Sequence, residues 1–156
     1  MKTLIKITCL FLSFLLVLNC SKNDDEKNNP EFQFSPEQLN GGWKISFFSD
    51  ENGERTSEFS GYVFIFNTEE ESAFISYNVN YKTSSIEIFQ EENLGENIWV
   101  LYTDFDNIDN PGNADLNDLV EDWMVTNVNT DATFIEFEEL YSDNTPEILH
   151  ITKLLN

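Results

Sequence analysis

The sequence predicts an all-β domain of about eight antiparallel strands, and three observations support this prediction. Short apolar runs recur from residue 43 onward at strand spacing, separated by polar turn clusters. Aromatic residues, which suit pleated sheets, are abundant, with 14 Phe, five Tyr and three Trp. No window of helical period is long enough to predict an ordinary helix. Eight such strands in one compact domain indicate a closed up-and-down barrel, with a β-sandwich as the alternative.

The first 19 residues have the pattern of a secretory signal peptide, which we expect to be removed. Lys2 and Lys6 give a positive start, and the apolar run that follows, 7–18, is too short to span a bilayer as an ordinary helix. The run ends just before Asn19 and Cys20. This boundary resembles the bacterial lipobox, although Asn19 departs from the usual small residue. The resemblance implies covalent lipid such as palmitate on Cys20; a plain secretory signal that happens to contain a cysteine is the alternative.

The segment 20–35 is expected to be a lipid-anchored flexible tether. Residues 21–30 are wholly polar and cannot bury enough apolar surface to fold. Their acidic cluster resembles the export signal of surface-displayed lipoproteins of Bacteroidota, and Ser21, rather than Asp, argues against retention at the inner membrane. The resemblance implies an outer-membrane protein exposed at the cell surface. Its membrane contact is the lipid, which holds stably when more than one chain is attached.

The two cysteines of the chain leave the folded domain without a disulfide. Cys9 departs with the signal peptide, and Cys20 is committed to lipid. The domain, 36–156, must therefore hold together by its core alone, even though its compartment would permit disulfides.

The mature chain, 20–156, is strongly acidic. It holds six basic residues against 29 acidic ones, a formal charge of −23. Nucleic-acid binding is excluded because it needs a basic surface, and anionic lipid headgroups are disfavoured for the same reason. Solubility and self-repulsion on a crowded surface explain this charge most simply, and a cation or a basic partner is the alternative.

Eight strands are expected along the domain, joined by polar turns. The strand segments are 43–49, 61–67, 73–81, 85–89, 97–104, 122–128, 133–140 and 147–154. In 73–81 the odd-numbered residues form an apolar face opposite serine and asparagine. In 133–140, Ile135 and Phe137 alternate with glutamates, which indicates a half-buried strand. Residues 116–120 are expected to form one short helical turn.

Several blocks of the sequence resemble a known family. Residues 39–45 contain Gly41-x-Trp43, which resembles the lipocalin signature. The blocks 59–66, 116–125 and 149–154 look like those of small lipocalin-like lipoproteins of Bacteroidota. The resemblance spans nearly all of residues 39–154. It implies a lipocalin-like barrel in which Gly41 permits a tight turn and Trp43 plugs the closed end. Most of that family lacks an assigned activity.

We expect no enzymatic activity, no catalytic residues and no cofactor apart from the covalent lipid. His150 is the only histidine, and no serine or cysteine pattern suggests a triad around it. A zinc site is not expected either, because there is no second histidine and no free cysteine. We therefore interpret His150 as a structural or surface residue.

An acidic segment at 104–118 has the ligand types that calcium prefers. Its spacing does not match a calcium loop of the EF-hand kind: counted from Asp104, the sixth position is Asp109 rather than glycine. We therefore expect a solvated acidic loop and no metal site. The alternative is calcium bound through Asp104, Asp106 and Asp109.

Two functions remain open from the sequence. The first is a surface-anchored, non-enzymatic domain that binds a small apolar or aromatic ligand, since eight-stranded barrels can hold one small molecule. Tyr77, Trp99 and Tyr102 are the candidate lining residues. The second is an accessory or interaction module with a filled core that binds a protein or glycan partner.

Overall fold

The computed structural model describes residues 34–105, 111–112, 114–142 and 145–155, which hold nine β-strands and three short 3-10 helices. The strands are β1 (Gly41–Asp50), β2 (Gly53–Glu54), β3 (Tyr62–Asn67), β4 (Ser72–Tyr77), β5 (Asn80–Asn93), β6 (Glu96–Asp104), β7 (Asp122–Val128), β8 (Phe134–Glu139) and β9 (Ile148–Lys153). The 3-10 helices are η1 (Pro36–Leu39), η2 (Thr56–Phe59) and η3 (Leu116–Leu119). All the described residues fall within one compact unit.

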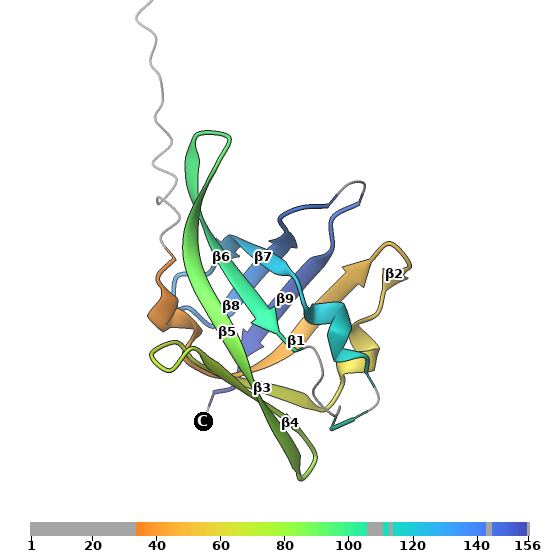
Figure 1. Cartoon of the computed structure of the whole chain (residues 1–156). Coiled ribbons are helices and arrows are strands. Elements are labelled where there is room, and N and C mark those ends of the chain that lie inside the picture. The colour runs from red at the N-terminus through yellow and green to blue at the C-terminus, as the bar shows by residue number, and fades with distance from the viewer. Residues whose placement is uncertain (1–33, 106–110, 113, 143–144, 156) are drawn as a thin grey trace, which may run out of the picture. The chain divides into compact units, whose positions relative to one another are not determined.

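Eight of the strands close into an antiparallel barrel (Figure 1). Each strand from β3 to β8 pairs with the next strand along the chain, and β1 pairs with β3 on one side and with β9 on the other. The short β2 pairs only with the far end of β1. The predicted all-β fold and the lipocalin-like up-and-down barrel are confirmed, and the β-sandwich alternative is wrong. Closure leaves few exposed edges in a domain that has no disulfide.

The barrel core comes from alternate residues of the strands. On β3, Tyr62, Phe64 and Phe66 are buried, and each is separated from the next by a more exposed residue. On β8, Ile135 and Phe137 are buried between partly exposed glutamates, which confirms the half-buried strand. Because the domain has no disulfide, burial of these side chains supplies its main stabilisation.

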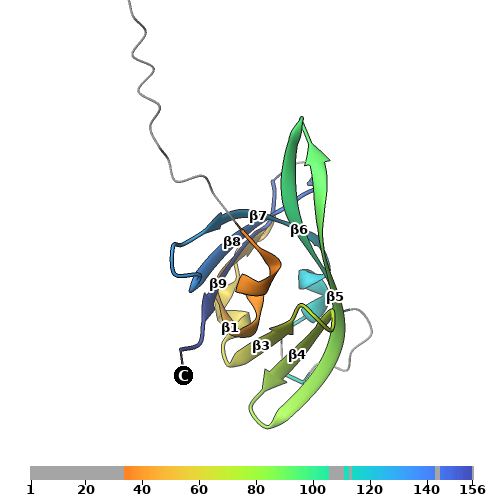
Figure 2. The same ribbon diagram turned by 90° about the vertical axis from the view of Figure 1, so that its left-hand side faces the viewer.

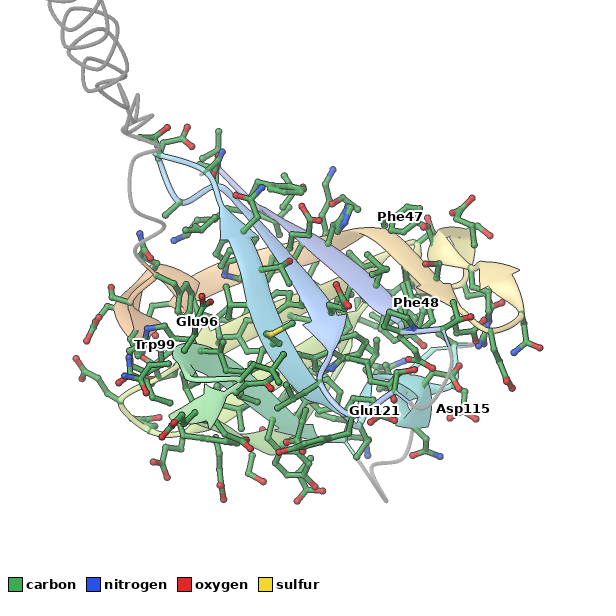
Figure 3. The ribbon with its side chains drawn as sticks, turned by 90° about the horizontal axis from the view of Figure 1, so that it is seen from above. Phe47, Phe48, Glu96, Trp99, Asp115 and Glu121 are labelled. Carbon is green, nitrogen blue, oxygen red and sulfur yellow. The ribbon has the colours of Figure 1, made fainter. Side chains whose placement is uncertain are left out.

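A β-bulge in β1 decides which of two adjacent phenylalanines is inside. The register of β1 against β9 shifts between Ile45 and Phe47. Because of this shift, Phe48 follows Trp43 and Ile45 into the core, although strict alternation would have placed Phe47 there. Phe47 stays partly exposed and packs on the ring of His150, with 4.9 Å between ring centroids. Both phenylalanines are labelled in Figure 3.

The predicted strand 73–81 is wrong, because the chain reverses within it. β4 ends at Tyr77, which pairs with Asn80 at the start of β5. Asn78 and Val79 therefore form a two-residue hairpin turn. Asn78 has a φ of 54°, a left-handed conformation that asparagine tolerates well. Val79 is 90 % exposed at the turn. The alternation continued through the turn by coincidence, which concealed it in the sequence.

The strand after this turn is longer than predicted. β5 contains the predicted segment 85–89 and extends beyond it at both ends, and only Leu94 and Gly95 join it to β6. The short helical turn near residue 116 is confirmed as η3, where the Asp115 side chain accepts a hydrogen bond from the Asn117 backbone N–H. Within the described residues, no helix is long and apolar enough to cross a membrane.

The 3-10 helices lie at the two ends of the barrel. η1 lies at one end, and η2 and η3 lie side by side at the other (Figures 1 and 2). Leu39 of η1, Phe59 of η2 and Leu119 of η3 are all buried in the same hydrophobic core. Each end of the barrel therefore carries an apolar side chain from a helix.

Candidate functional site

The interior of the barrel is filled by side chains. Aromatic rings pack along it, with 6.5 Å between the centroids of Phe64 and Phe66 and 6.0 Å between those of Phe64 and Phe105. The space that remains among them is about 20 Å³, lined by residues that include Leu101, Thr103 and Phe137. That volume is about enough for one water molecule, whereas pockets for drug-sized ligands measure roughly 300–1,000 Å³.

Two buried tryptophans are held by the same local arrangement. Trp43 donates its indole N–H to the carbonyl of Leu39 at 2.5 Å, and Trp123 donates to the carbonyl of Leu119 at 3.1 Å. Each leucine is the last residue of a 3-10 helix, four positions before its tryptophan, and both tryptophans are fully buried. The bond satisfies the indole N–H and ties each helix to the strand that follows it. Gly41, at a φ of 108°, makes the turn between η1 and Trp43.

Arg55, the only arginine of the chain, holds three carboxylates at the η2 end. Its guanidinium donates to Asp50 at 2.6 Å, to Glu58 at 2.7 Å and to Asp118 at 2.6 Å. Burial of the Asp50 carboxyl raises its pKa, but the hydrogen bonds from Arg55 and Asn52 outweigh burial, so the pKa lies below its ordinary value. Hydrogen bonding to Arg55 likewise lowers the pKa of Glu58. The cluster joins β1, η2 and η3.

A second group of acidic residues lies between β7, β8 and the start of β9. The Glu147 backbone N–H donates to the Glu139 carboxylate at 3.2 Å. The Oε2 atom of Glu147 is fully enclosed and has no hydrogen-bond partner among the described residues. Burial, and then the charges of Glu139 and Glu121, raise the pKa of Glu147 to about 7. Burial and the charges of Glu139 and Asp122 also raise the pKa of Glu121.

An open groove lies near η1, beside the start of β6; we name it the mouth groove. Its volume is about 670 Å³, and its lining includes Phe34, Gln38, Gln90, Glu96, Asn97 and Trp99. The ring of Phe34 meets the Trp99 indole edge to face, with 6.0 Å between centroids. Figure 3 shows Glu96 and Trp99 close together, on the opposite side of the barrel from Asp115 and Glu121.

A second surface recess opens where β1 and β3 separate. These strands pair only from Gly41 to Trp43 on the β1 side, and beyond that point the recess has a volume of about 530 Å³. Its lining includes Phe59 and Tyr62, which are almost fully buried, together with serine and threonine residues. Little aromatic surface is therefore presented to solvent there.

The structure does not bring the three predicted lining residues together around one cavity. Tyr77 packs on Tyr62, with 4.8 Å between ring centroids. Trp99 lines the mouth groove, and Tyr102 occupies a position of opposite parity on β6, so the two side chains leave opposite faces of the strand. None of the three lines the small interior cavity.

The predicted lipid site, Cys20, lies outside the described residues, as do Asp106 and Asp109 of the calcium alternative. Asp104 ends β6, where its carboxylate accepts a hydrogen bond from the Ser85 hydroxyl at 3.2 Å. Among the residues that the structure describes, no group of three or more His, Cys, Asp or Glu side chains is placed to hold a metal ion. Calcium binding stays a prediction, and a melting temperature unchanged at millimolar calcium would remove it.

Gly112, in the same acidic segment, has a packing role. A Cβ atom added there would lie 2.2 Å from the Tyr62 hydroxyl oxygen. The same hydroxyl accepts a hydrogen bond from the Ala114 backbone N–H at 3.1 Å. Close approach to Tyr62 therefore accounts for the glycine.

His150 lies on the outer side of β9 among aromatic and acidic neighbours. Its ring packs between Phe47 and Phe134, and its Nε2 lies 3.8 Å from a Glu136 carboxylate oxygen. Glu136 is its cross-strand partner in the β8–β9 ladder. These contacts place His150 in the packing between β1, β8 and β9.

Arg55, Glu147 and the mouth groove were not predicted from the sequence. A single arginine in a chain of 29 acidic residues is a countable signal, and it marks a carboxylate cluster. The leucine four residues before each buried tryptophan is a second signal. The enclosure of Glu147 and the meeting of Phe34 with β6 depend on tertiary packing and leave no pattern in the sequence.

Comparison with known proteins found no match among protein-family models, curated proteins or solved structures.

Proposed function

We propose that this chain is a non-enzymatic lipoprotein, anchored to the outer membrane through Cys20, whose barrel binds a partner on its outer surface. One observation carries the choice between the two functions left open by the sequence. The cavity among the core side chains has a volume of about 20 Å³, far below the roughly 300–1,000 Å³ of a small-molecule pocket. The filled core therefore supports the interaction module over the carrier of an apolar molecule.

The anchoring part of the proposal rests on the resemblance to small lipocalin-like lipoproteins of Bacteroidota. The acidic composition supports it, because a charge of −23 on the mature chain keeps a displayed domain soluble and apart from anionic surfaces. A lipid on Cys20 followed by a polar tether would hold the barrel off the membrane and leave its outer face accessible.

Native mass spectrometry of the soluble chain 21–156, produced in the cells that make it, tests the interaction module against the carrier. We expect the mass of the polypeptide alone, since the interior has no place for a retained apolar molecule. An apolar small molecule that stays bound through purification and is released on unfolding would overturn the proposal.

Palmitate labelling of the full chain tests the anchor separately. The Cys20→Ala variant is expected to lose labelling and membrane retention, while Cys9→Ala, the matched control, keeps both. Labelling that survives in Cys20→Ala would show that the lipid is not on this residue.

A further inference from the structure

We propose that the mouth groove binds a neutral carbohydrate chain, with Trp99 as the apolar platform and neighbouring side-chain amides as partners for the sugar hydroxyls. This inference rests on the proposed function and names its partner. It begins from the one tryptophan that the fold leaves accessible. Trp43 and Trp123 are fully buried, whereas Trp99 is partly exposed and lines the groove.

The Trp99 ring is held in place from two sides. Phe34, itself buried, meets it at an interplanar angle of 71°, and the partly buried Trp99 side chain also packs against the barrel core. A rigid aromatic surface binds at low entropic cost because few rotamers are lost. Sugar rings carry a face of C–H groups that packs on such a surface, as other apolar groups do.

The polar lining matches hydroxyl groups. Gln90 is the cross-strand partner of Trp99 in the β5–β6 ladder, and Asn97 lies two residues away on β6. Gln38 comes from η1, and its amide oxygen accepts a hydrogen bond from the Ser35 backbone N–H at 2.8 Å, which fixes the side chain. An amide offers both donors and acceptors, and a hydroxyl needs both. Three amides around one aromatic ring therefore suit a polyhydroxylated ligand.

The charge of the groove selects a neutral ligand. Among the described residues that line it, Glu96 is the only charged one, and none is basic. A phosphate, a sulfate or an acidic sugar would lack a cationic partner there and would be repelled by a strongly acidic protein. The volume of about 670 Å³ accommodates a short oligosaccharide, and the open form lets a longer chain pass through.

An extended peptide is the competing occupant. On the side facing β7, β6 is paired only from Val100 to Tyr102, so its first residues have a free edge to which a strand could add. Glu96 lies on this unpaired stretch of β6. Charged side chains on an edge are the usual means by which proteins block strand addition. The Glu96 carboxylate therefore favours the carbohydrate over the peptide.

Intrinsic fluorescence of the soluble chain 21–156 provides the test, because this part contains the compact unit. The probes are neutral hexasaccharides: maltohexaose, cellohexaose, laminarihexaose, xylohexaose and mannohexaose. At least one is expected to change the tryptophan emission saturably, and the change should come from Trp99, since the other two tryptophans are buried. Isothermal titration calorimetry then supplies the affinity.

Three variants locate the binding. Trp99→Ala should abolish it, and Asn97→Ala, an exposed substitution that leaves the core intact, should weaken it about tenfold, as the loss of one good hydrogen bond predicts. Tyr81→Ala is the matched control, since Tyr81 is an exposed aromatic residue on β5 outside the groove, and binding should be unchanged.

Two results would overturn the inference. One is that none of these saccharides gives saturable binding up to about 10 mM. This result overturns the inference even if peptides selected from a random library bind the chain and lose binding in Trp99→Ala. The other is saccharide binding that Trp99→Ala and Asn97→Ala leave intact. Either result leaves the proposed function standing, whereas an apolar molecule retained in the native mass spectrum removes the proposed function itself.

Discussion

At the scale of single residues, two ionisable side chains, Arg55 and Glu147, have opposite electrostatic surroundings. Arg55 gathers three carboxylates, and Glu147 has a carboxylate oxygen that is enclosed without a hydrogen-bond partner among the described residues. The carboxylates around Arg55 have a positive partner, whereas the Glu147 carboxylate has none among the described residues. Ionisation of the Arg55 partners should therefore raise the free energy of unfolding, and ionisation of Glu147 should lower it.

Replacing Arg55 with alanine should lower the free energy of unfolding by about 2 kcal/mol, because the Asp50 carboxylate, only 6 % exposed, would lose its charged partner. Arg55→Lys, the matched control, keeps the charge without the planar fork and should lose less. Urea denaturation at neutral pH measures both. Equal stability of Arg55→Ala and the parent chain would show that the cluster makes no net contribution.

Glu147 should make the barrel less stable as the pH rises from about 4.5 to about 7. Its pKa is raised to about 7 in the folded chain, so folding favours the protonated form. That stabilisation is complete below the unfolded pKa and is lost as the pH passes the folded pKa. Glu147→Gln, which cannot ionise, should escape this loss.

The comparison of urea midpoints at pH 5 and pH 8 isolates the effect of Glu147. The parent chain should lose about 1–2 kcal/mol more than Glu147→Gln between these values, after allowance for solvent screening. General charge repulsion affects both chains and cancels in the difference. Parallel pH profiles of the two chains would contradict the account.

At the scale of elements, the two-residue hairpin turns decide where the strands end. Leu94 and Gly95 join β5 to β6, and Leu94 has a φ of 53° while fully exposed. A left-handed conformation costs an ordinary side chain roughly 1 kcal/mol. The Leu94 side chain is fully exposed, so its burial does not offset this cost.

Leu94→Asn should therefore raise the free energy of unfolding by about 0.5–1 kcal/mol, because asparagine tolerates this conformation and no buried contact is lost. Leu94→Val is the matched control; a β-branched side chain at a positive φ should lower stability. Thermal denaturation followed by circular dichroism compares the two. A loss of stability in Leu94→Asn would mean that the leucine makes a contact that the fold does not reveal.

Strand positions were largely predictable from the sequence, and turns that resemble strands were not. Alternation on β8 gave its buried face correctly, because a pleated strand has a strict period of two. The turn at Asn78 was missed because Val79 kept the apolar alternation. The bulge in β1 was missed because its cause is the register against β9, a strand about a hundred residues away.

At the scale of the whole molecule, the closed barrel followed from the strand count, but its filled interior did not. Whether aromatic residues line a cavity or fill it depends on how their rings meet across the barrel, as Phe64 and Phe105 do. For the same reason the sequence grouped Tyr77, Trp99 and Tyr102, which the fold places apart. The chain thus has a barrel built like a ligand carrier, and its accessible recesses lie at the mouth groove and where β1 and β3 separate.

The central claim is that the interior is closed and the outer face is the binding surface. It is tested most directly by titrating the soluble chain 21–156 with the neutral apolar fluorophore N-phenyl-1-naphthylamine. Phe74→Ser serves as the control, because it removes an exposed apolar side chain that could bind the probe from outside. We expect no saturable binding in either chain. One-to-one saturation that persists in Phe74→Ser, and also in Trp99→Ala, which removes the aromatic surface of the mouth groove, would reveal an internal cavity and contradict the account.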